Sequence, residues 1–118
     1  GLTSRLMLPT AHRLNKKIDI DRVFKQGRTV YAGDLALRFA PARGAARFTV
    51  VASLKVSKRA NKRNLLKRRL RETLRRDILP QLKQNIDGLL LTKQPLLKLS
   101  HPELKQLTAA LFKKAHLI

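Results

Sequence analysis

The sequence predicts an α/β (α+β) fold, a two-layer sandwich with a small mixed sheet, in the order helix, strand, strand, helix, strand, helix. A helix is indicated where Leu66, Leu70 and Leu74 recur every four residues, because this spacing gives one apolar stripe. A strand is indicated where Leu35 and Leu37 alternate with other residues. Hydrophobic residues make up 43% of the 118 residues, enough for the core of one domain.

The first third of the chain is expected to hold an arm, a helix and a strand. Residues 1–17 are basic and irregular and form the predicted arm, which leaves residues 18–118 as a single domain. Residues 19–28 form the predicted first helix, with Asp19 as a suitable N-cap. Residues 29–41 follow as the first strand.

The rest of the chain is expected to supply two strands and two helices. Residues 47–54 form a second strand, which we expect to pair with the first strand in a hairpin. Residues 61–79 form the main helix, and residues 85–93 contain a short apolar run that predicts a third strand. Residues 100–115 form the last helix, which opens with a Ser-x-x-Glu capping box.

The charge of the chain is strongly one-sided. Its 27 Lys and Arg stand against 7 Asp and Glu, a formal net charge of +20. Such self-repulsion favours binding to a polyanion, with nucleic acid as the first candidate and an anionic membrane surface as the second. The absence of cysteine excludes disulfides and cysteine metal sites. No apolar run is long enough to span a bilayer, and we expect a cytoplasmic location.

The positive charge is concentrated in residues 59–76, which contain nine Lys or Arg. Within about 60° of the helical wheel, beside the leucine stripe, lie Asn64, Arg68, Arg71 and Arg75. A further side of the helix carries Lys62, Arg69 and Arg76. The nearby acids, Glu72 and Asp77, are too few to neutralise these cations by i,i+4 pairing, so the segment predicts an external polyanion.

Folded RNA fits the basic segment at least as well as duplex DNA does. Arginine suits phosphate, whereas no helix-turn-helix and no heptad zipper for a basic region is evident. Aromatic residues total five, so base stacking is limited to a few positions. The alternatives are a structural ribosomal or other RNA-binding protein without an enzymatic partner, a DNA-binding protein, and a binder of anionic membranes.

Several motifs resemble those of one family. The segment KRNLLKRRLRE (62–72) is similar to the signature helix of the bacterial ribonuclease P protein subunit, and VFKQGR (23–28) precedes it at the family's separation. HRLNKK, LALRFAP and SLKVSKRANKRN also follow the family's order. The resemblance implies a fold like the second domain of ribosomal protein S5, with a left-handed βαβ crossover, although right-handed crossovers are the rule.

The resemblance also implies a function. A protein of this family binds a large catalytic RNA, and together they remove the 5′ leader from precursor tRNA. Mg²⁺ is then bound mainly by the RNA, and no organic cofactor, membrane or obligate protein partner is expected. The sequence agrees with an accessory role for the polypeptide, because its acidic residues are dispersed and no nucleophile with its base can be singled out.

The family's motifs imply site residues position by position. Those implied to contact the catalytic RNA are Arg13, Lys62, Arg63, Asn64, Lys67, Arg68 and Arg71. Those implied to line a leader cleft between the first helix and the open sheet face are Ile20, Phe24 and Arg38. Leu65 departs from the pattern, which has arginine there, and Lys62 or Arg69 is expected to compensate. No metal ligand is assigned.

Two of the cleft residues have a simpler interpretation. Phe24 lies on the apolar side of its helix and would be a core residue by the sequence alone. Arg38 alternates out of a strand, where a solvated edge is the default. Cleft lining by either residue therefore depends on the resemblance.

Overall fold

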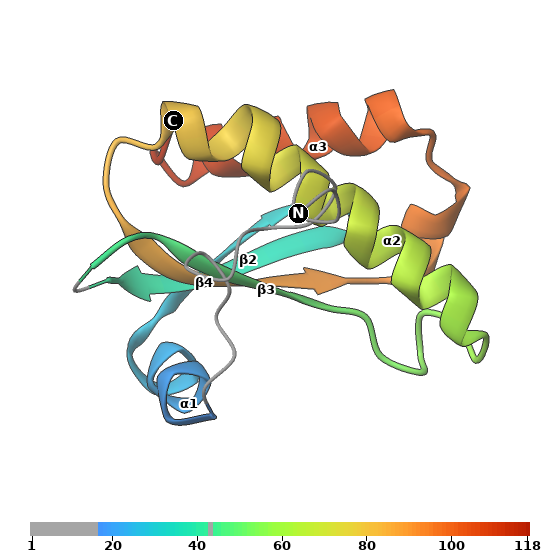
Figure 1. Cartoon of the computed structure of the whole chain (residues 1–118), viewed down its shortest axis with the longest axis horizontal. Helices are drawn as coiled ribbons and strands as arrows, with labels where there is room; N and C mark the ends of the chain where they lie inside the picture. Colours follow the sequence, from blue (N-terminus) through green and yellow to red (C-terminus); the bar gives the residue numbers. More distant parts are fainter. Residues whose placement is uncertain (1–16, 43) are drawn as a thin grey trace, which may run out of the picture.

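The computed structural model describes residues 17–42 and 44–118, and these residues form an open four-stranded sheet with three α-helices (Figure 1). The elements are α1 (Lys17–Gln26), β1 (Arg28–Ala32), β2 (Leu35–Pro41), β3 (Arg47–Val51), α2 (Ala60–Thr73), β4 (Ile86–Thr92) and α3 (His101–Lys114). A π turn at Leu74–Ile78 and a 3₁₀ turn at Leu79–Gln81 extend α2, and a second 3₁₀ segment, Gln94–Lys98, precedes α3. The predicted arm lies outside the described residues, except for Lys17.

The sheet has the strand order β1-β2-β4-β3. β2 pairs antiparallel with both β1 and β4, whereas β3 and β4 pair in parallel. The register places Val30 opposite Leu37, and Leu37 opposite Leu90, so these side chains share one face. Since α2 connects the parallel strands β3 and β4, the segment from Arg47 to Thr92 is a βαβ unit.

The prediction of one strand over residues 29–41 is wrong, because this segment folds into the hairpin β1–β2. Ala32 pairs with Leu35, and Gly33 and Asp34 form the two-residue turn between them. Gly33 has φ = 58°, a conformation that glycine adopts without a steric penalty. The predicted element order therefore lacked one strand.

The predicted hairpin between residues 29–41 and 47–54 is also wrong. β4 lies between β2 and β3, so these two consecutive strands do not pair. The first five residues of β4, Ile86–Leu90, are all buried, as expected for an interior strand that is covered on both faces.

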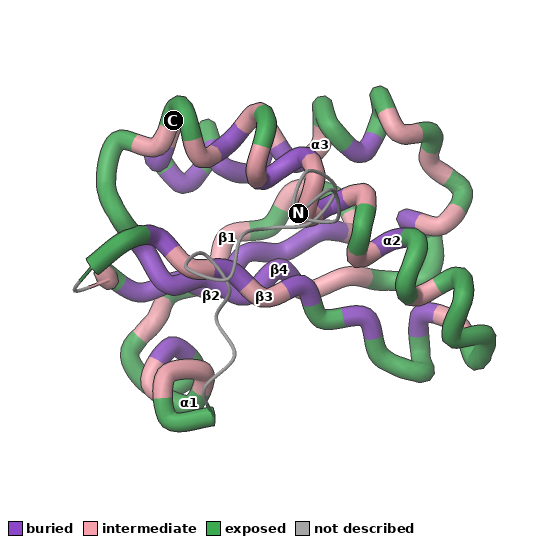
Figure 2. Tube along the Cα trace, in the orientation of Figure 1, coloured by how far each residue is buried: buried purple, intermediate pink, exposed green. Residues whose placement is uncertain are grey.

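The helices lie on both faces of the sheet. α2 and α3 cover one face, and α1 packs on the other (Figures 1 and 2). The main core lies under α2 and α3, where Phe48 and Phe112 meet edge to face with ring centroids 5.9 Å apart. The sheet and the pair α2 and α3 form the two predicted layers, and α1 adds a small layer on the opposite face.

The helix ends follow local capping chemistry. α3 has the predicted capping box, in which the Glu103 amide donates to the Ser100 hydroxyl and the Ser100 amide donates to the Glu103 carboxylate. α1 ends before Gly27, whose amide donates to the Val23 carbonyl at 2.8 Å. Asp19 lies inside the first turn of α1 and is not its N-cap, which corrects that prediction. None of the helices in the described ranges is long and apolar enough to cross a membrane.

Candidate nucleic-acid interface

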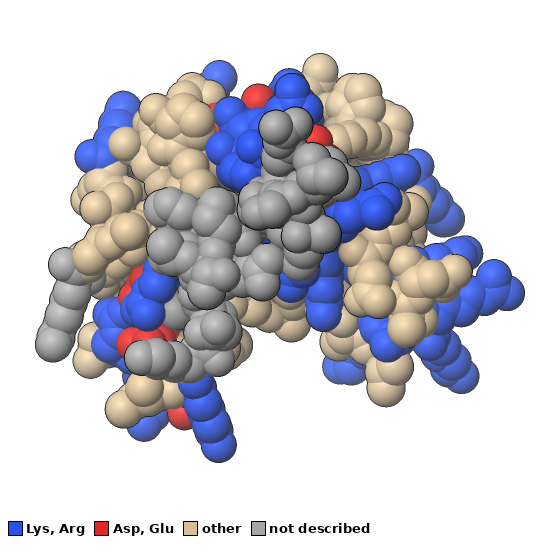
Figure 3. Space-filling view, viewed as in Figure 1, with Lys and Arg blue, Asp and Glu red and all other residues tan. Residues whose placement is uncertain are grey.

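The first candidate surface is the basic side of α2. Leu66, Leu70 and Thr73 point into the core, and the same periodicity turns Asn64, Lys67, Arg68 and Arg71 to one flank of the helix. We call these four residues the α2 basic flank. Figure 3 shows Lys and Arg side chains gathered along α2, with few acidic side chains among them.

The acids near α2 are paired with cations outside the α2 basic flank. Glu72 accepts from Arg76 at 3.2 Å, and Asp77 pairs with Lys105 at 3.4 Å. Among the described residues, no ion pair joins Lys67 or Arg68 to a carboxylate. The first turn of α2 contains no acid and its N-cap, Arg59, makes no side-chain cap bond, so this end adds positive potential from the helix dipole.

Two of the predicted RNA-contacting residues lie elsewhere on α2. The Arg63 guanidinium donates to the Ser57 carbonyl at 2.7 Å, so this side chain holds the loop that precedes the helix. Lys62 lies with Arg69 on the other flank of α2, where both line a pocket of about 140 Å³ against Leu96 and Leu97. Arg13 lies outside the described residues.

Leu65 lies on the ridge between the two flanks of α2. It lines the pocket that contains Lys62 and Arg69, and it also lines a shallow hollow with Asn64 and Arg68. Its side chain is 38% exposed. The cations expected to compensate for the missing arginine therefore flank Leu65 on one side, and Arg68 flanks it on the other.

The second candidate surface is formed by α1 and the sheet face on which it packs. Val23 is fully buried against Ala40 and Leu89, with Ile20 partly buried beside them. Phe24 follows 100° further round the helix and is 48% exposed. The interpretation of Phe24 as a core residue is therefore wrong, because Val23 occupies the core position.

Arg38 lies beside Phe24 and is not a solvated edge residue. Its Nε donates to the Phe24 carbonyl at 3.1 Å, with a second bond from a terminal nitrogen, and its Nη1 donates to the Thr29 hydroxyl at 2.9 Å. β2 is an inner strand, and this cation binds the C-terminal end of α1, where the helix dipole favours positive charge. Three of its five N–H groups are used in this way.

Sequence reasoning missed Tyr31. The register pairs Tyr31 with Ala36 and Thr29 with Arg38, so Tyr31 shares the sheet face of Arg38. It is 59% exposed. The Gly-Asp dipeptide after Ala32 is a two-residue hairpin signal, and reading it would have placed Tyr31 on a separate strand with a defined face. We call Ile20, Phe24, Tyr31, Ala36 and Arg38 the open-face patch.

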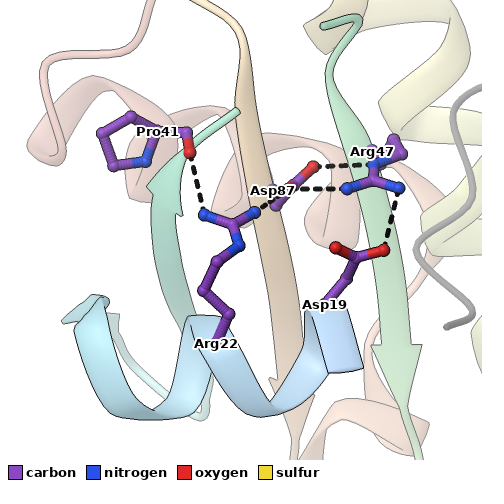
Figure 4. Close-up of polar contacts among 5 residues, drawn as sticks. All are labelled: Asp19, Arg22, Pro41, Arg47 and Asp87. Carbon is purple, nitrogen blue, oxygen red and sulfur yellow. Dashed lines mark hydrogen bonds and ion pairs between the residues drawn. The ribbon is translucent and has the colours of Figure 1, made fainter. Parts of the chain in front are cut away.

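A charged network joins α1 to the sheet (Figure 4). Asp87 of β4 is fully buried and accepts from Arg47 at 3.0 Å and 2.9 Å, and from Arg22 of α1. Arg47 also donates to Asp19 at 3.2 Å, and Arg22 donates to the Pro41 carbonyl at 3.2 Å. The hydrogen bonds to Asp87, aided by Asp19, raise the pKa of the Arg47 guanidinium above its usual range.

Neither surface contains a set of metal ligands. Within residues 17–42 and 44–118, no three His, Asp or Glu side chains are grouped so that they could hold a metal ion. Asp19 and Asp87, the two acids that share Arg47, are paired with arginine. The chemistry that the two surfaces offer is the binding of phosphate by cations and of bases by exposed aromatic rings.

Sequence comparison finds one family. The family model described as Ribonuclease P matches residues 8–116. A ribonuclease P protein component from Synechococcus elongatus is 38% identical over 93 residues, which cover 75% of this chain and 75% of the relative. One from Microcystis aeruginosa is 32% identical over 109 residues, which cover 85% of this chain and 90% of the relative.

Solved structures agree in fold. The RNase P protein from Staphylococcus aureus superposes with a TM-score of 0.80 at 21% identity, covering 92% of this chain and 98% of that protein. The RNase P protein from Thermotoga maritima superposes with a TM-score of 0.77 at 23% identity, covering 86% of this chain and 94% of that protein. At these identities the superpositions establish the shared fold.

Proposed function

Because the chain belongs to the ribonuclease P protein family, we propose that it is the protein subunit of a ribonucleoprotein endonuclease that matures the 5′ ends of tRNA. The polypeptide binds the catalytic RNA and the 5′ leader of precursor tRNA, and it assists the endonucleolytic removal of that leader. The observation that carries this proposal is the family match over residues 8–116, which includes both candidate surfaces.

The α2 basic flank is the proposed contact with the catalytic RNA. Lys67 and Arg68 are cations without a carboxylate partner in the described part of the chain, and Asn64 beside them can donate to phosphate or sugar. Arg71 completes the flank, and Arg63 holds the preceding loop in place. Lys62 extends the contact around Leu65, and Arg13 is proposed to add to it from the N-terminal arm.

The open-face patch is the proposed contact with the leader. Phe24 and Tyr31 are exposed aromatic side chains, and an unpaired base can stack on each. Arg38 retains two N–H groups that can reach a leader phosphate. α1 and α2 lie on opposite faces of the sheet, so one subunit can bind leader and catalytic RNA at once (Figure 1).

The polypeptide contributes binding and screening to the reaction. The described residues do not fit a Mg²⁺ site, since no group of three oxygen or nitrogen ligands is assembled, and we assign the divalent ions mainly to the RNA partner. A net charge of +20 offsets repulsion between the phosphates of two RNA molecules. No organic cofactor and no obligate protein partner enters this proposal.

Finer features of the fold and the location belong to the same proposal. Residues 18–118 act as one RNA-binding domain, preceded by a basic arm over residues 1–17. The βαβ unit β3-α2-β4 has the left-handed crossover that the family resemblance implies, in a fold like the second domain of ribosomal protein S5. The parallel pairing of β3 and β4 around α2 supports the βαβ unit, and the left-handed crossover rests on the family resemblance. We place the protein in the cytoplasm with the tRNA precursors.

Reconstitution tests the function. The cleavage of precursor tRNA by a bacterial ribonuclease P RNA is measured at low Mg²⁺ concentration with and without the protein. We expect faster cleavage at the mature 5′ end when the protein is present, because it screens phosphate repulsion. Equal rates with and without the protein would contradict the proposal and favour a structural RNA-binding protein.

A further inference from the structure

The attachment of α1 to the sheet is largely polar. Among residues 17–42 and 44–118, Val23, Ala40 and Leu89 are the buried residues of the small apolar cluster under this helix, whereas the core on the other face contains twenty. Burial of so little apolar surface fixes the position of a helix only weakly. Ile20 and Leu91 add partly buried apolar contacts, and charged side chains make the polar ones.

Asp87 is the centre of these contacts. Both of its carboxylate oxygens accept from arginine, and its side chain has no exposure to solvent. Arg22 belongs to α1. Arg47 belongs to β3 and also forms an ion pair with Asp19 of α1 (Figure 4). One buried carboxylate therefore binds α1 directly at Arg22, near the middle of the helix, and through Arg47 at Asp19 in its first turn.

Arg38 holds the other end of the same helix. Its guanidinium donates to the Phe24 carbonyl and to Thr29 of β1. Phe24 thus lies at the end of α1 that Arg38 binds, and the Asp87 network binds the same helix at Asp19 and Arg22. Any movement of α1 across the sheet would move the Phe24 ring relative to Tyr31.

We infer that Asp87 is a positioning residue for leader binding: it fixes α1 through Arg22 and Arg47 and thereby sets the place of Phe24 in the open-face patch. This inference rests on the proposed function of that patch. The network contains two acids and two arginines and has no net charge, so it orients the helix without adding to the positive potential that attracts RNA.

The removal of the buried charge should release α1. Removing the carboxylate from a buried ion pair strongly destabilises the structure that the pair holds, whereas an ion pair on the surface contributes little to stability. Asp87→Asn keeps the size of the side chain, leaves Arg22 without its carboxylate partner and leaves Arg47 with Asp19 alone. Asp77→Asn is the matched control, because it changes the net charge equally and breaks the Lys105 pair far from α1.

The experiment has two readouts. The first is the affinity of the enzyme reconstituted with catalytic RNA for precursor tRNA divided by its affinity for mature tRNA, which we call the leader preference. The second is the distance between spin labels on α1 and α3, introduced as Lys25→Cys and Gln106→Cys into a chain that has no other cysteine. Binding of the catalytic RNA is measured alongside.

For Asp87→Asn we expect a broader distance distribution and a fall in leader preference of about tenfold, with catalytic-RNA affinity unchanged. Asp77→Asn should leave all three quantities unchanged. If Asp87→Asn does not fold, Asp19→Asn replaces it, because that change removes one link and leaves Asp87 paired. For Asp19→Asn a fall of about threefold is expected.

Two results would overturn the positioning role. One is an unchanged leader preference in a variant whose α1 has moved, and the other is an equal loss of affinity for precursor and mature tRNA. The wild-type protein distinguishes this failure from failure of the proposed function. If the wild-type enzyme itself shows no leader preference, the proposal that the open-face patch binds the leader is wrong, and the proposed role of Asp87 is wrong as well.

Discussion

The Nε of Arg38 donates to the carbonyl oxygen of Phe24 at 3.1 Å, which joins an inner strand of the sheet to the C-terminal end of α1. The contact joins the Arg38 guanidinium to the backbone of Phe24, whose ring is exposed, on the sheet face opposite α2 and α3. In the proposed function the two side chains act together, with the ring available to a base and the remaining N–H groups to a phosphate.

Phe24→Ala is expected to impair leader binding without impairing folding. The ring is about half exposed, so the free energy of unfolding should change by less than about 1 kcal/mol. Loss of one stacked base should weaken precursor tRNA binding by about 1–3 kcal/mol and leave mature tRNA binding unchanged. Affinities of the reconstituted enzyme for both RNAs and thermal unfolding of the protein provide the check.

Val23→Ala is the matched control on the neighbouring residue. Val23 is fully buried, so truncation should lower the free energy of unfolding by about 1–2 kcal/mol through lost burial. If Phe24→Ala destabilised the protein as much as Val23→Ala, the assignment of Phe24 to the surface would be wrong.

Lys67→Ala combined with Arg68→Ala should weaken catalytic-RNA binding and its dependence on salt. Each cation that contacts a phosphate releases about one counterion, so the slope of log K against log salt should become shallower by about two. Lys93→Ala combined with Lys98→Ala removes the same charge from exposed positions near the start of α3 and serves as the control. Equal slopes for wild type and the Lys67/Arg68 variant would exclude phosphate contact there.

Leu65→Arg should strengthen catalytic-RNA binding. Position 65 lies on the ridge between Arg68 and the pocket of Lys62 and Arg69, and its side chain is exposed enough to accept a charge. One additional phosphate contact would steepen the salt slope by about one. Binding titrations at several salt concentrations measure this, with Leu65→Gln as the uncharged control. A slope that stays the same would place position 65 outside the RNA contact.

The capping box of α3 should make stability depend on pH in the acid range. The Ser100 amide and hydroxyl lower the pKa of Glu103 from its ordinary value of 4.5. Since the folded pKa lies below the unfolded one, this stabilisation is complete above about pH 4.5 and is lost as the pH falls through the folded pKa.

Glu103→Gln isolates this effect, because glutamine keeps an acceptor for the Ser100 amide and does not titrate. The difference in unfolding free energy between wild type and Glu103→Gln should be constant near neutral pH and should shift against the wild type as the solution becomes acid. A difference that is independent of pH across this range would show that the Ser100 contacts do not bind the charged carboxylate in solution.

The helices and the α2 basic flank could be predicted from the sequence because they depend on local periodicity. Leu66, Leu70 and Leu74 define the buried side of α2, and the cations on its flanks follow from a rotation of 100° per residue. The capping box of α3 is likewise a local pattern of two residues, Ser100 and Glu103.

The sheet order and the open-face patch could not be predicted in the same way. The insertion of β4 between β2 and β3 depends on pairing between segments far apart in the chain, and the periodicity of residues does not determine such pairing. In α1, Ile20, Val23 and Phe24 fall on one side of the helix. The rotation of the docked helix about its axis buries Val23 against Ala40 and Leu89 and leaves Phe24 exposed. The bonds that Arg38 and Asp87 make to α1 likewise exist only once this helix is docked.

We propose that α2 binds the catalytic RNA while the opposite face of the sheet binds the leader. Photo-crosslinking from two positions of the assembled enzyme tests this division. A benzophenone amino acid is placed at position 24 in one variant and at position 68 in another, and the crosslinked nucleotides are mapped in complexes with precursor tRNA. The account predicts that position 24 crosslinks to the leader and position 68 to the catalytic RNA. Crosslinks from both positions to the same RNA, or none from position 24 to the leader, would contradict it.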